Sequence, residues 1–449
     1  MKYLSKIIEY GLYLLAFLLP IQTRLIIKAG FNEYQTYSLY GVDILLILVL
    51  LLFAICVVYS WIAGQIRNDK NELVPYGNRI IWWFIGGFVL ISAISFLFAS
   101  DKLLAIYKFG WLILGVGLFW LITRVNYNKL KLIYAMLVGI FLQAVLGIWQ
   151  FLTQSSFANK WLGLAAHDPA QLGTSVVEFI AKDGIGERWL RAYGGLDHPN
   201  ILGGVLAAGI LLIVFLFLDN KNSELKIKYK KAIFYSLFFI FITALFFTFS
   251  RGAWLAVLAG GLFMLISFVI KRDLKSQKEM LIAILLSSIL IGVLFFQYNE
   301  LVITRLGDNS RLEIKSRIER VASYNEALQI IKKYPLTGVG LGNYTLALSR
   351  EIPNQESFYY QPTHNVFLLV CAETGIIGLL FFVLINLSLL IFSFKKMNDR
   401  AVAIIIALIV IMSLDHWLFS LHFGVLFFWL VLGLMISEKE KNLNPSASL

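Results

Sequence analysis

Three short stretches of this apolar sequence combine arginine or histidine with glycine, proline or asparagine. The first, RAYGGLDHPN, contains Arg191, His198 and Asn200 and leads directly into an apolar run. An arginine beside a helix N-terminus can bind a phosphate group, because the guanidinium and the free N–H groups of the helix both attract anions. The alternative is an interfacial loop in which Asn200 caps the helix and Arg191 contacts lipid headgroups. His198 is either a hydrogen-bond donor in this site or an ordinary loop residue.

Arg251, in the segment FSRGAWL, occupies a very short turn between two apolar runs. A charged side chain at such a place is costly unless it is paired or reaches the water interface. One interpretation is that Arg251 extends to lipid phosphate. Because the turn is so short, the side chain is more readily directed into the helix bundle, and we favour a functional site.

The third stretch, PTHN, places His364 and Asn365 before an apolar run that contains Glu373. A histidine can take up a proton at neutral pH, so His364 is a candidate catalytic residue. Taken alone, His364 also fits a surface residue, and Asn365 fits a helix cap. Glu373 lies roughly two and a half helical turns further on and half a rotation away. We therefore expect Glu373 to form a buried ion pair or hydrogen bonds, and not to exchange a proton with His364.

The glycine-rich segment PLTGVGLGN looks like a nucleotide-binding loop, but it follows an amphipathic segment and Pro335, where a nucleotide site would need a strand. Gly338 and Gly340 therefore predict sharp bends with close backbone approach. The sequence contains no Asp-x-Asp pair, no Gly-x-Ser-x-Gly motif, and no set of histidine, cysteine and carboxylate residues with metal-ligand spacing. We predict that the protein uses no metal and no cofactor.

The composition indicates that these groups lie in a membrane protein. Of the 449 residues, 59% are hydrophobic and only 15% are charged, whereas about a quarter of the residues in a soluble domain are charged. So little charge cannot cover a water-exposed surface of this size, which excludes soluble multidomain enzymes and disordered scaffolds. The two cysteines lie inside apolar runs, which excludes a disulfide framework. We predict an all-α integral membrane protein.

A helix needs about 20 apolar residues to cross a bilayer. Runs of this kind predict about twelve transmembrane helices in a single polytopic membrane domain, residues 1–449. The last two runs share one apolar stretch, broken by Asp415, His416 and His422, so eleven spans is the alternative. The runs cover residues 7–27, 41–63, 80–98, 103–123, 131–152, 199–218, 232–249, 252–270, 280–297, 365–394, 401–417 and 420–436.

Lysine and arginine are concentrated in short segments on one side of these runs, including the loop 219–231. Because basic short loops stay in the cytoplasm, we expect both termini inside and two long segments, 153–198 and 298–364, on the outer (periplasmic) face of the cytoplasmic membrane. The net charge of +12 is then a topology signal, and no binding to nucleic acid is expected. The second segment predicts an amphipathic helix over 313–333, with apolar residues at helical spacing. These residues are Ile314, Ile318, Val321, Leu328 and Ile331.

The order of these motifs on one side of the membrane resembles the O-antigen ligase and polymerase superfamily of bacterial membrane glycosyltransferases. The resemblance extends over about residues 185–380, and the first five runs share only their hydropathy with the family. The motifs that carry it are Arg191 with Gly194 and the His-Pro-Asn run, Arg251-x-x-x-Leu255, Pro335-x-x-Gly-x-Gly340, His364-Asn365 and Glu373-x-Gly375.

The resemblance implies a twelve-helix fold and a metal-independent, inverting transfer of a glycan from undecaprenyl diphosphate. Arg191 and Arg251 would hold the diphosphate, and His364 would be the catalytic residue. The supporting residues would be His198, Asn200, Gly338, Gly340, Asn365 and Glu373. Fixed guanidinium groups can stabilise the growing charge on a leaving diphosphate, which would replace a divalent metal. The helix at 313–333 would cover the donor glycan, guide the acceptor, or simply pack over the bundle.

Two alternatives to the ligase remain. The ligase branch, which we favour, uses a glycolipid such as lipid A core or another hydroxyl acceptor, whereas a polysaccharide polymerase uses a second lipid-linked glycan. A polysaccharide or lipid transporter is the more distant alternative, because transporters carry polar residues at the bilayer midplane on broken helices. Glu373 is the main midplane charge in this sequence. A transporter also has no need of a long outer segment that ends in the candidate histidine.

Overall fold

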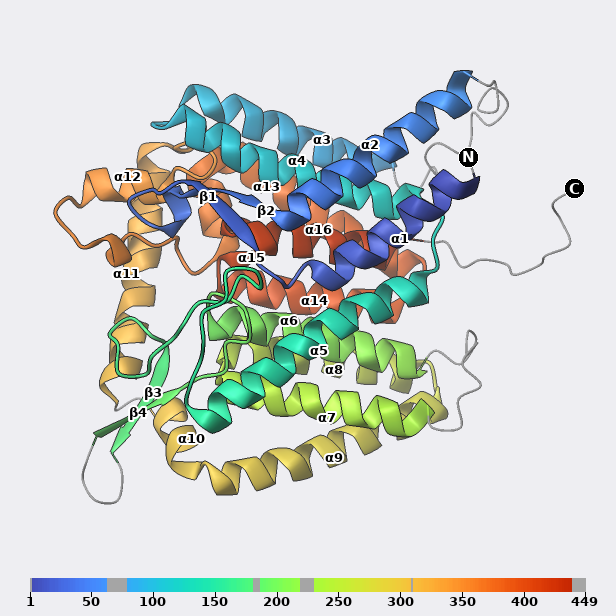
Figure 1. Ribbon diagram of the computed structural model, residues 1–449, viewed down its shortest axis with the longest axis vertical. Helices are drawn as coiled ribbons and strands as arrows, with labels where there is room; N and C mark the ends of the chain where they lie inside the picture. The colour runs from blue at the N-terminus through green and yellow to red at the C-terminus, as the bar shows by residue number, and fades with distance from the viewer. Residues whose placement is uncertain (1, 63–78, 181–185, 219–229, 308–309, 438–449) are drawn as a thin grey trace, which may run out of the picture.

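The computed structural model describes residues 2–62, 79–180, 186–218, 230–307 and 310–437 (Figure 1). A helix lies in each of the apolar runs predicted from the sequence. Eight described helices are long and apolar enough to cross a membrane, namely α2–α6, α8, α9 and α13, which confirms the all-α membrane class; crossing by all twelve remains a prediction. The bundle helices are α1 (Lys2–Leu18), α2 (Gly41–Ile62), α3 (Arg79–Ile94), α4 (Lys102–Arg124), α5 (Lys129–Thr153), α6 (Pro199–Leu218), α7 (Lys230–Thr248), α8 (Arg251–Ile270), α9 (Leu274–Gln297), α13 (Val366–Lys395), α14 (Asp399–Leu414) and α16 (His422–Ile436).

The first predicted run, residues 7–27, is only partly helical. α1 ends at Leu18, because Pro20 lacks an N–H and restricts the residue before it. The residues that follow form β1 (Arg24–Lys28), which pairs with the antiparallel strand β2 (Tyr37–Tyr40). The apolar residues after Leu18 therefore belong to the end of the bundle, and the predicted boundary is wrong.

Helices without polar interruptions form the centre of the bundle. In α6, 94% of the most apolar stretch is buried, and this helix packs against α5, α7, α8 and α14. All of α16 is buried, and it packs mainly against α4. α9 lies at the edge, where only 6% of its apolar stretch is buried. Apolar side chains that face either other helices or the outside of the bundle are suited to a bilayer, where lipid replaces water.

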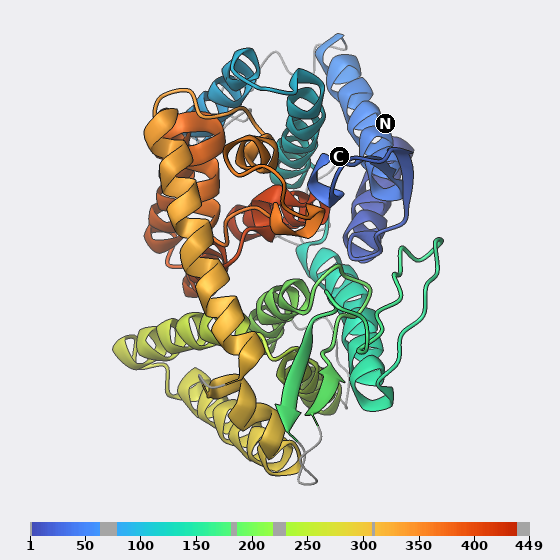
Figure 2. The same cartoon turned by 90° about the vertical axis from the view of Figure 1, so that its left-hand side faces the viewer.

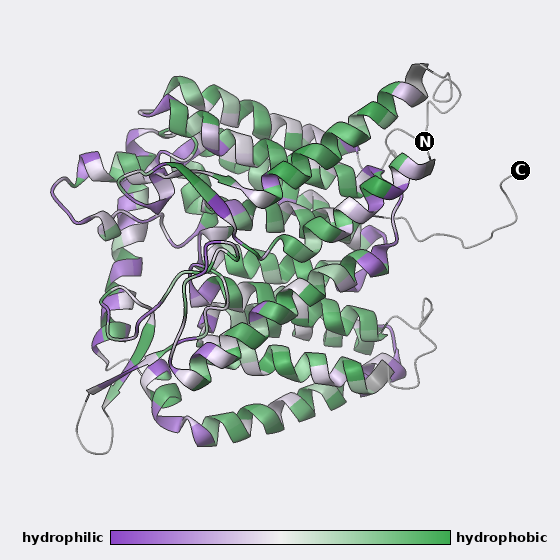
Figure 3. Ribbon diagram, in the orientation of Figure 1, coloured by the Kyte–Doolittle hydropathy of each residue, from purple (hydrophilic) through white to green (hydrophobic). Residues whose placement is uncertain are grey.

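The connections at one end of the bundle, on the left of Figure 1, are long and structured. Polar residues gather there and at the opposite end (Figure 3). Both predicted long segments lie at this same end, but its outward orientation remains a prediction. The expected inner segments 63–78 and 219–229 lie outside the described residues. Besides β1 and β2, the elements at this end include β3 (Val176–Ile180), β4 (Gly186–Leu190), α10 (Asn299–Leu306), α12 (Tyr344–Glu351), α15 (Trp417–Ser420) and the short 3-10 helices η1 (Glu33–Gln35) and η4 (Ser357–Tyr359).

The predicted amphipathic helix is present as α11 (Arg311–Lys333), which crosses the end of the bundle (Figure 2). Most of its predicted apolar positions lie outside its buried face, since Ile318 is 61% exposed and Val321 is 56% exposed, and only Ile331 among them packs against the buried cluster. Ala327 and Ile330 are buried instead, where α11 packs against α13. The periodicity predicted the helix correctly, but not the face that packs.

The helix that follows His364 is broken in its first half. α13 is interrupted at Gly375, whose φ of 73° lies in the left-handed region. The PLTGVGLGN segment docks at this break, where the Gly340 N–H donates to the carbonyl of Glu373 (2.9 Å). Gly338 also has a positive φ, of 64°, and a Cβ there would lie 2.3 Å from the backbone of Glu373. The predicted bends with close backbone approach are confirmed.

Candidate active site

The segment before α6 is held against the bundle by two buried glutamines of α5. The Gln150 side chain accepts a hydrogen bond from the Gly194 N–H (2.8 Å), and the Gln143 side chain accepts one from the Gly195 N–H (2.5 Å). Gly194 has a φ of 62°, and a Cβ there would lie 2.9 Å from the Gln143 carbonyl oxygen. These contacts set the position of Arg191 and of the N-terminus of α6.

Arg191 is buried, and its guanidinium donates hydrogen bonds to three protein acceptors. These are the Thr248 carbonyl (2.8 Å), Ser175 Oγ (2.7 Å) and Asn200 Oδ1 (2.9 Å). Burial, followed by the charge of Arg305, lowers the pKa of Arg191, and the three acceptors replace the water that burial removes. Arg191 therefore joins the end of α7 to the N-terminus of α6.

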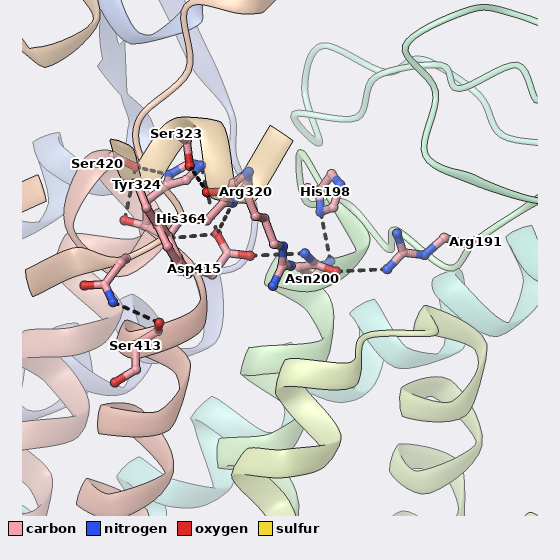
Figure 4. A network of polar contacts seen from close by, with 12 residues as sticks. Arg191, His198, Asn200, Arg320, Ser323, Tyr324, His364, Ser413, Asp415 and Ser420 are labelled. Carbon is pink, nitrogen blue, oxygen red and sulfur yellow. Dashed lines mark hydrogen bonds and ion pairs between the residues drawn. The ribbon is translucent and has the colours of Figure 1, made fainter. Parts of the chain in front are cut away.

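Asn200 connects Arg191 to Asp415, which follows α14 (Figure 4). The Asn200 Nδ2 donates to one carboxylate oxygen of Asp415 (3.1 Å), and the other oxygen lies 3.8 Å from Nδ1 of His364. The Nδ1 of His198 accepts from the Asn200 N–H (3.1 Å), so this ring lies beside the same network. Burial, followed by Arg191, lowers the pKa of His198. The structure thus brings four predicted site residues together, through an aspartate that the motifs did not select.

Three contacts hold the turn that carries His364. Its carbonyl accepts a hydrogen bond from the hydroxyl of Tyr324 on α11 (3.2 Å). Asn365 Oδ1 caps α13 by accepting from the Leu368 N–H (3.0 Å), and Asn365 Nδ2 donates to the Ser413 carbonyl (3.0 Å). The helix cap considered for Asn365 is therefore present. The His364 side chain is 26% exposed, so part of its ring is accessible to a substrate.

Asp415 and His416 are neighbours that differ in whether they carry a charge at neutral pH. Burial alone would raise the pKa of Asp415, but its interactions with His364 and His416 outweigh burial, and the pKa lies well below its usual value. Burial lowers the pKa of His416 to about 4, although Asp415 opposes this effect. Nδ1 of His416 and Oγ of Ser420 are hydrogen-bonded at 2.7 Å. The carboxylate is therefore ionised while His416 is neutral.

Arg251 lines a pocket of about 410 Å³ together with Asn200 and Asp415. Arg305 of α10 and Arg320 of α11 line the same pocket. In Figure 4 the Arg320 side chain points toward Asn200 and Asp415. Three guanidinium groups around one space suit a ligand with several negative oxygens, because arginine binds phosphate through paired N–H donors. We call this space the arginine pocket.

A carboxylate already pairs with two of these arginines. Glu313, in the first turn of α11, is buried, and its Oε2 lies 2.9 Å from the Arg251 guanidinium. Glu313 also forms an ion pair with Arg305. The Arg251 side chain nevertheless remains 46% exposed, so it can contact a second anion without losing Glu313.

Gly338, Gly340 and Glu373 lie apart from the arginine pocket. The Glu373 carboxylate accepts hydrogen bonds from the N–H groups of Gly342 (2.7 Å) and Tyr344 (3.4 Å). The expected hydrogen-bonding role of Glu373 is confirmed. These residues support the break in α13, and none of them is among the residues that line the arginine pocket.

His364, Asp415 and His416 could hold a metal ion, because their possible ligand atoms all lie within 4.8 Å of one another. The rings of the two histidines lie 5.2 Å apart between centroids. Metal-ligand spacing along the chain could not reveal this group, since His364 and Asp415 are far apart in sequence and meet only in the fold. The expectation that the protein uses no metal remains a prediction, which this group makes testable.

The motifs missed three residues of the site. Asp415 was visible in the sequence as a carboxylate that breaks an apolar stretch, and an ionisable residue there is a signal because burying it in a membrane is costly. Arg305 and Arg320 gave no comparable signal, since both lie in polar segments where exposed arginines are ordinary. Only the fold directs them into one pocket with Arg251.

The described structure is that of a multi-helix membrane protein with a histidine–aspartate pair and an arginine pocket at one end of its bundle. Residues 236–383, about one third of the chain, match the family model described as O-antigen ligase. The match begins in α7 and ends in α13, and it includes all three pocket arginines and His364. The resemblance to the O-antigen ligase superfamily is therefore confirmed. The comparison with curated proteins gave no match.

Proposed function

We propose that this protein is a membrane glycosyltransferase that moves a glycan from undecaprenyl diphosphate to a hydroxyl group of a glycolipid, such as lipid A core, at the outer face of the cytoplasmic membrane. The observation that carries the proposal is the position of His364 and Asp415 beside the arginine pocket. A base next to an anion-binding pocket is what a transfer with a diphosphate leaving group requires. The match to the O-antigen ligase model supports this class of reaction.

In this proposal the arginine pocket binds the donor diphosphate. Arg251 contacts the phosphate oxygens through its exposed part, and Arg305 and Arg320 add charge from the pocket wall. Arg191 has its guanidinium bonded to three protein groups. The predicted direct contact of Arg191 with phosphate would require one of these bonds to break. Its present contacts favour a positioning role, in which Arg191 holds Asn200 and, through it, Asp415.

His364 is the proposed general base. The Asp415 carboxylate lies on the Nδ1 side of the ring, which favours the proton on Nδ1 and leaves Nε2 free to accept another. The acceptor hydroxyl gives its proton to Nε2, and its oxygen bonds to C1 of the donor sugar. The bond from C1 to the diphosphate oxygen breaks, and the electron pair leaves with the diphosphate. Attack from the face opposite the leaving group inverts the configuration at C1.

The arginines replace a metal in this scheme, because their fixed charge stabilises the diphosphate most when its bond to C1 breaks. A metal bound by Asp415, His416 and Nδ1 of His364, the nitrogen that faces Asp415, would leave the ring proton on Nε2, which then could not accept a proton from the acceptor. The two functions of His364 therefore exclude each other, so metal removal and metal addition both test the proposal.

The proposal is tested with purified protein in lipid nanodiscs, supplied with a glycan on undecaprenyl diphosphate. Lipid A core and a second lipid-linked glycan are offered in separate reactions. Transfer to lipid A core supports the ligase, and elongation of the second lipid-linked glycan would support the polymerase instead. Absence of transfer to both acceptors by folded protein would contradict the proposed reaction. A His364→Ala protein serves as the inactive control.

A further inference from the structure

A second pocket, of about 620 Å³, also has residues of α15 in its wall. The side chain of Trp417, at the start of α15, lines the arginine pocket, whereas Leu418, Phe419 and Ser420 line the second pocket. Its wall also includes Lys108, from the first half of α4. We call this space the lysine pocket.

Lys108 is a buried lysine without a carboxylate partner among the described residues. The residue is 8% exposed, and no carboxylate of the described part of the chain lies within 4 Å of its amine. The Nζ lies 3.6 Å from the centroid of the Trp111 ring and donates one long hydrogen bond, of 3.5 Å, to the Ser420 carbonyl. A cation–π contact offsets only part of the cost of removing an ammonium from water. An anion in the pocket would supply the missing partner.

Glu373 also lines the lysine pocket, but its carboxylate is already used. It accepts the backbone N–H groups of Gly342 and Tyr344, which hold the loop that docks on α13. Glu373 therefore lowers the cost of burying Lys108 by electrostatic attraction at a distance, without forming an ion pair with it. The Lys108 ammonium keeps N–H donors that a ligand can reach.

Ser420 links the lysine pocket to the candidate base. Its carbonyl accepts from Lys108, and its hydroxyl is bonded to Nδ1 of His416 (2.7 Å), whose ring lies beside that of His364. Figure 4 shows Ser420 on the side of His364 that is away from Arg191. Tyr34, which lines the lysine pocket, also contacts the His416 ring edge-on, at 5.8 Å between centroids. The histidines therefore lie between the two pockets.

We propose that the lysine pocket binds the acceptor, as a saccharide that carries an anionic group bound by Lys108. This inference rests on the proposed function, since it assigns the second substrate of that reaction. Aromatic rings on the pocket wall provide flat surfaces against which the apolar faces of a sugar ring can pack. These rings belong to Tyr34, Phe88, Trp111, Phe382, Phe419, Phe428 and Trp429. A donor in one pocket and an acceptor in the other would place the reacting hydroxyl at His364.

The test compares Lys108→Met with the parent protein, using acceptors with a phosphate, with a carboxylate, and with neither group. Methionine keeps the length of the side chain and removes the charge. We expect the acceptor KM for the anionic substrates to rise about tenfold or more, while the donor KM and the slow hydrolysis of the donor by water stay unchanged. The acceptor without an anionic group should bind parent and variant equally. Whichever anionic acceptor shows the larger change identifies the native group.

Lys102→Met is the matched control, because Lys102 is an exposed lysine on the same helix. An unchanged acceptor KM in folded Lys108→Met would overturn the inference, and so would an equal rise with the neutral acceptor. If Lys108→Met does not fold, Lys108→Arg replaces it, with a thermal-shift measurement. The anionic acceptor should raise the Tm of the parent and of Lys108→Arg, and it should do so without donor; no shift in the parent would overturn the inference. Failure of the parent to transfer any glycan would instead contradict the proposed function.

Discussion

The walls of the arginine pocket and the lysine pocket include different residues of α15, and the two pockets differ in how their basic side chains are held. In the arginine pocket, Glu313 pairs with Arg251 and Arg305, so an incoming anion must share these partners. In the lysine pocket, the Lys108 amine lies against the Trp111 ring and donates to the Ser420 carbonyl, and no carboxylate of the described residues pairs with it. The first arrangement keeps several charges close together and suits a diphosphate. In the lysine pocket, a single anionic group of a ligand would provide the ion-pair partner that Lys108 lacks.

The largest effect is expected for the residue between the pockets. His364→Ala should lower transfer about 10²- to 10⁴-fold, the usual loss for a general base. Donor binding should remain near the parental level, because proton removal matters in the transition state and not in the ground-state complex. Donor affinity and product formation are measured separately on purified protein. A variant that turns over normally, or whose defect is confined to donor binding, would remove His364 from the role of base.

Arg251→Lys tests the arginine pocket alone. We expect turnover to fall about tenfold or more although the charge is kept, because an ammonium cannot reproduce the paired N–H donors of a guanidinium. The acceptor KM should not change, in contrast to Lys108→Met. Arg272→Lys, at an exposed position at the opposite end of the bundle, is the control. Parental turnover of Arg251→Lys at saturating donor would show that Arg251 extends to lipid phosphate instead.

The free energy of unfolding at acidic pH should report on His416, whose ring is hydrogen-bonded to Ser420 of the lysine pocket. Its pKa is about 4 in the folded protein against 6.5 without the fold, so the unfolded chain binds the proton first. The contribution of His416 to the free energy of unfolding is therefore fully present above pH 6.5, and it is lost as the pH falls toward 4. At pH 5 this histidine should cost about 2 kcal/mol relative to pH 7. Unfolding in detergent at both pH values should show a smaller decrease for His416→Asn, and equal decreases would contradict the buried, neutral state.

Metal removal should have the smallest effect. EDTA should leave transfer by the parent protein unchanged, because the arginine pocket supplies the positive charge. Zinc should inhibit if His364, Asp415 and His416 can collect around an ion, and Asp415→Asn should weaken that inhibition. Loss of activity in EDTA that zinc or magnesium restores would replace His364 as a base with a metal-dependent mechanism.

Local sequence features predicted the parts of this fold that depend on neighbouring residues. The apolar runs predicted the bundle helices, and the periodicity of residues 313–333 predicted α11. Gly338 and Gly340 predicted backbone bends, because glycine readily adopts the positive φ that both residues have. The run at 7–27 was extended too far, since hydropathy alone does not count the effect of Pro20 on the helix. All of these features, including the end of α1 that was predicted wrongly, depend on residues that are close together in the sequence.

Tertiary structure decided which polar groups meet. His364 precedes α13 and Asp415 follows α14, so no spacing rule along the chain could pair them. The sequence has no set of residues with metal-ligand spacing, but these two residues come together with His416 in the fold. The same applies to Arg305 and Arg320, which share a pocket with Arg251 only because α10 and α11 fold over the start of α8. Arg191 was visible as an arginine beside a helix N-terminus, but its three acceptors come from separate segments. The residue types that can do chemistry are a property of the sequence, whereas their charge states and partners depend on burial and distance, which only the packed helices determine.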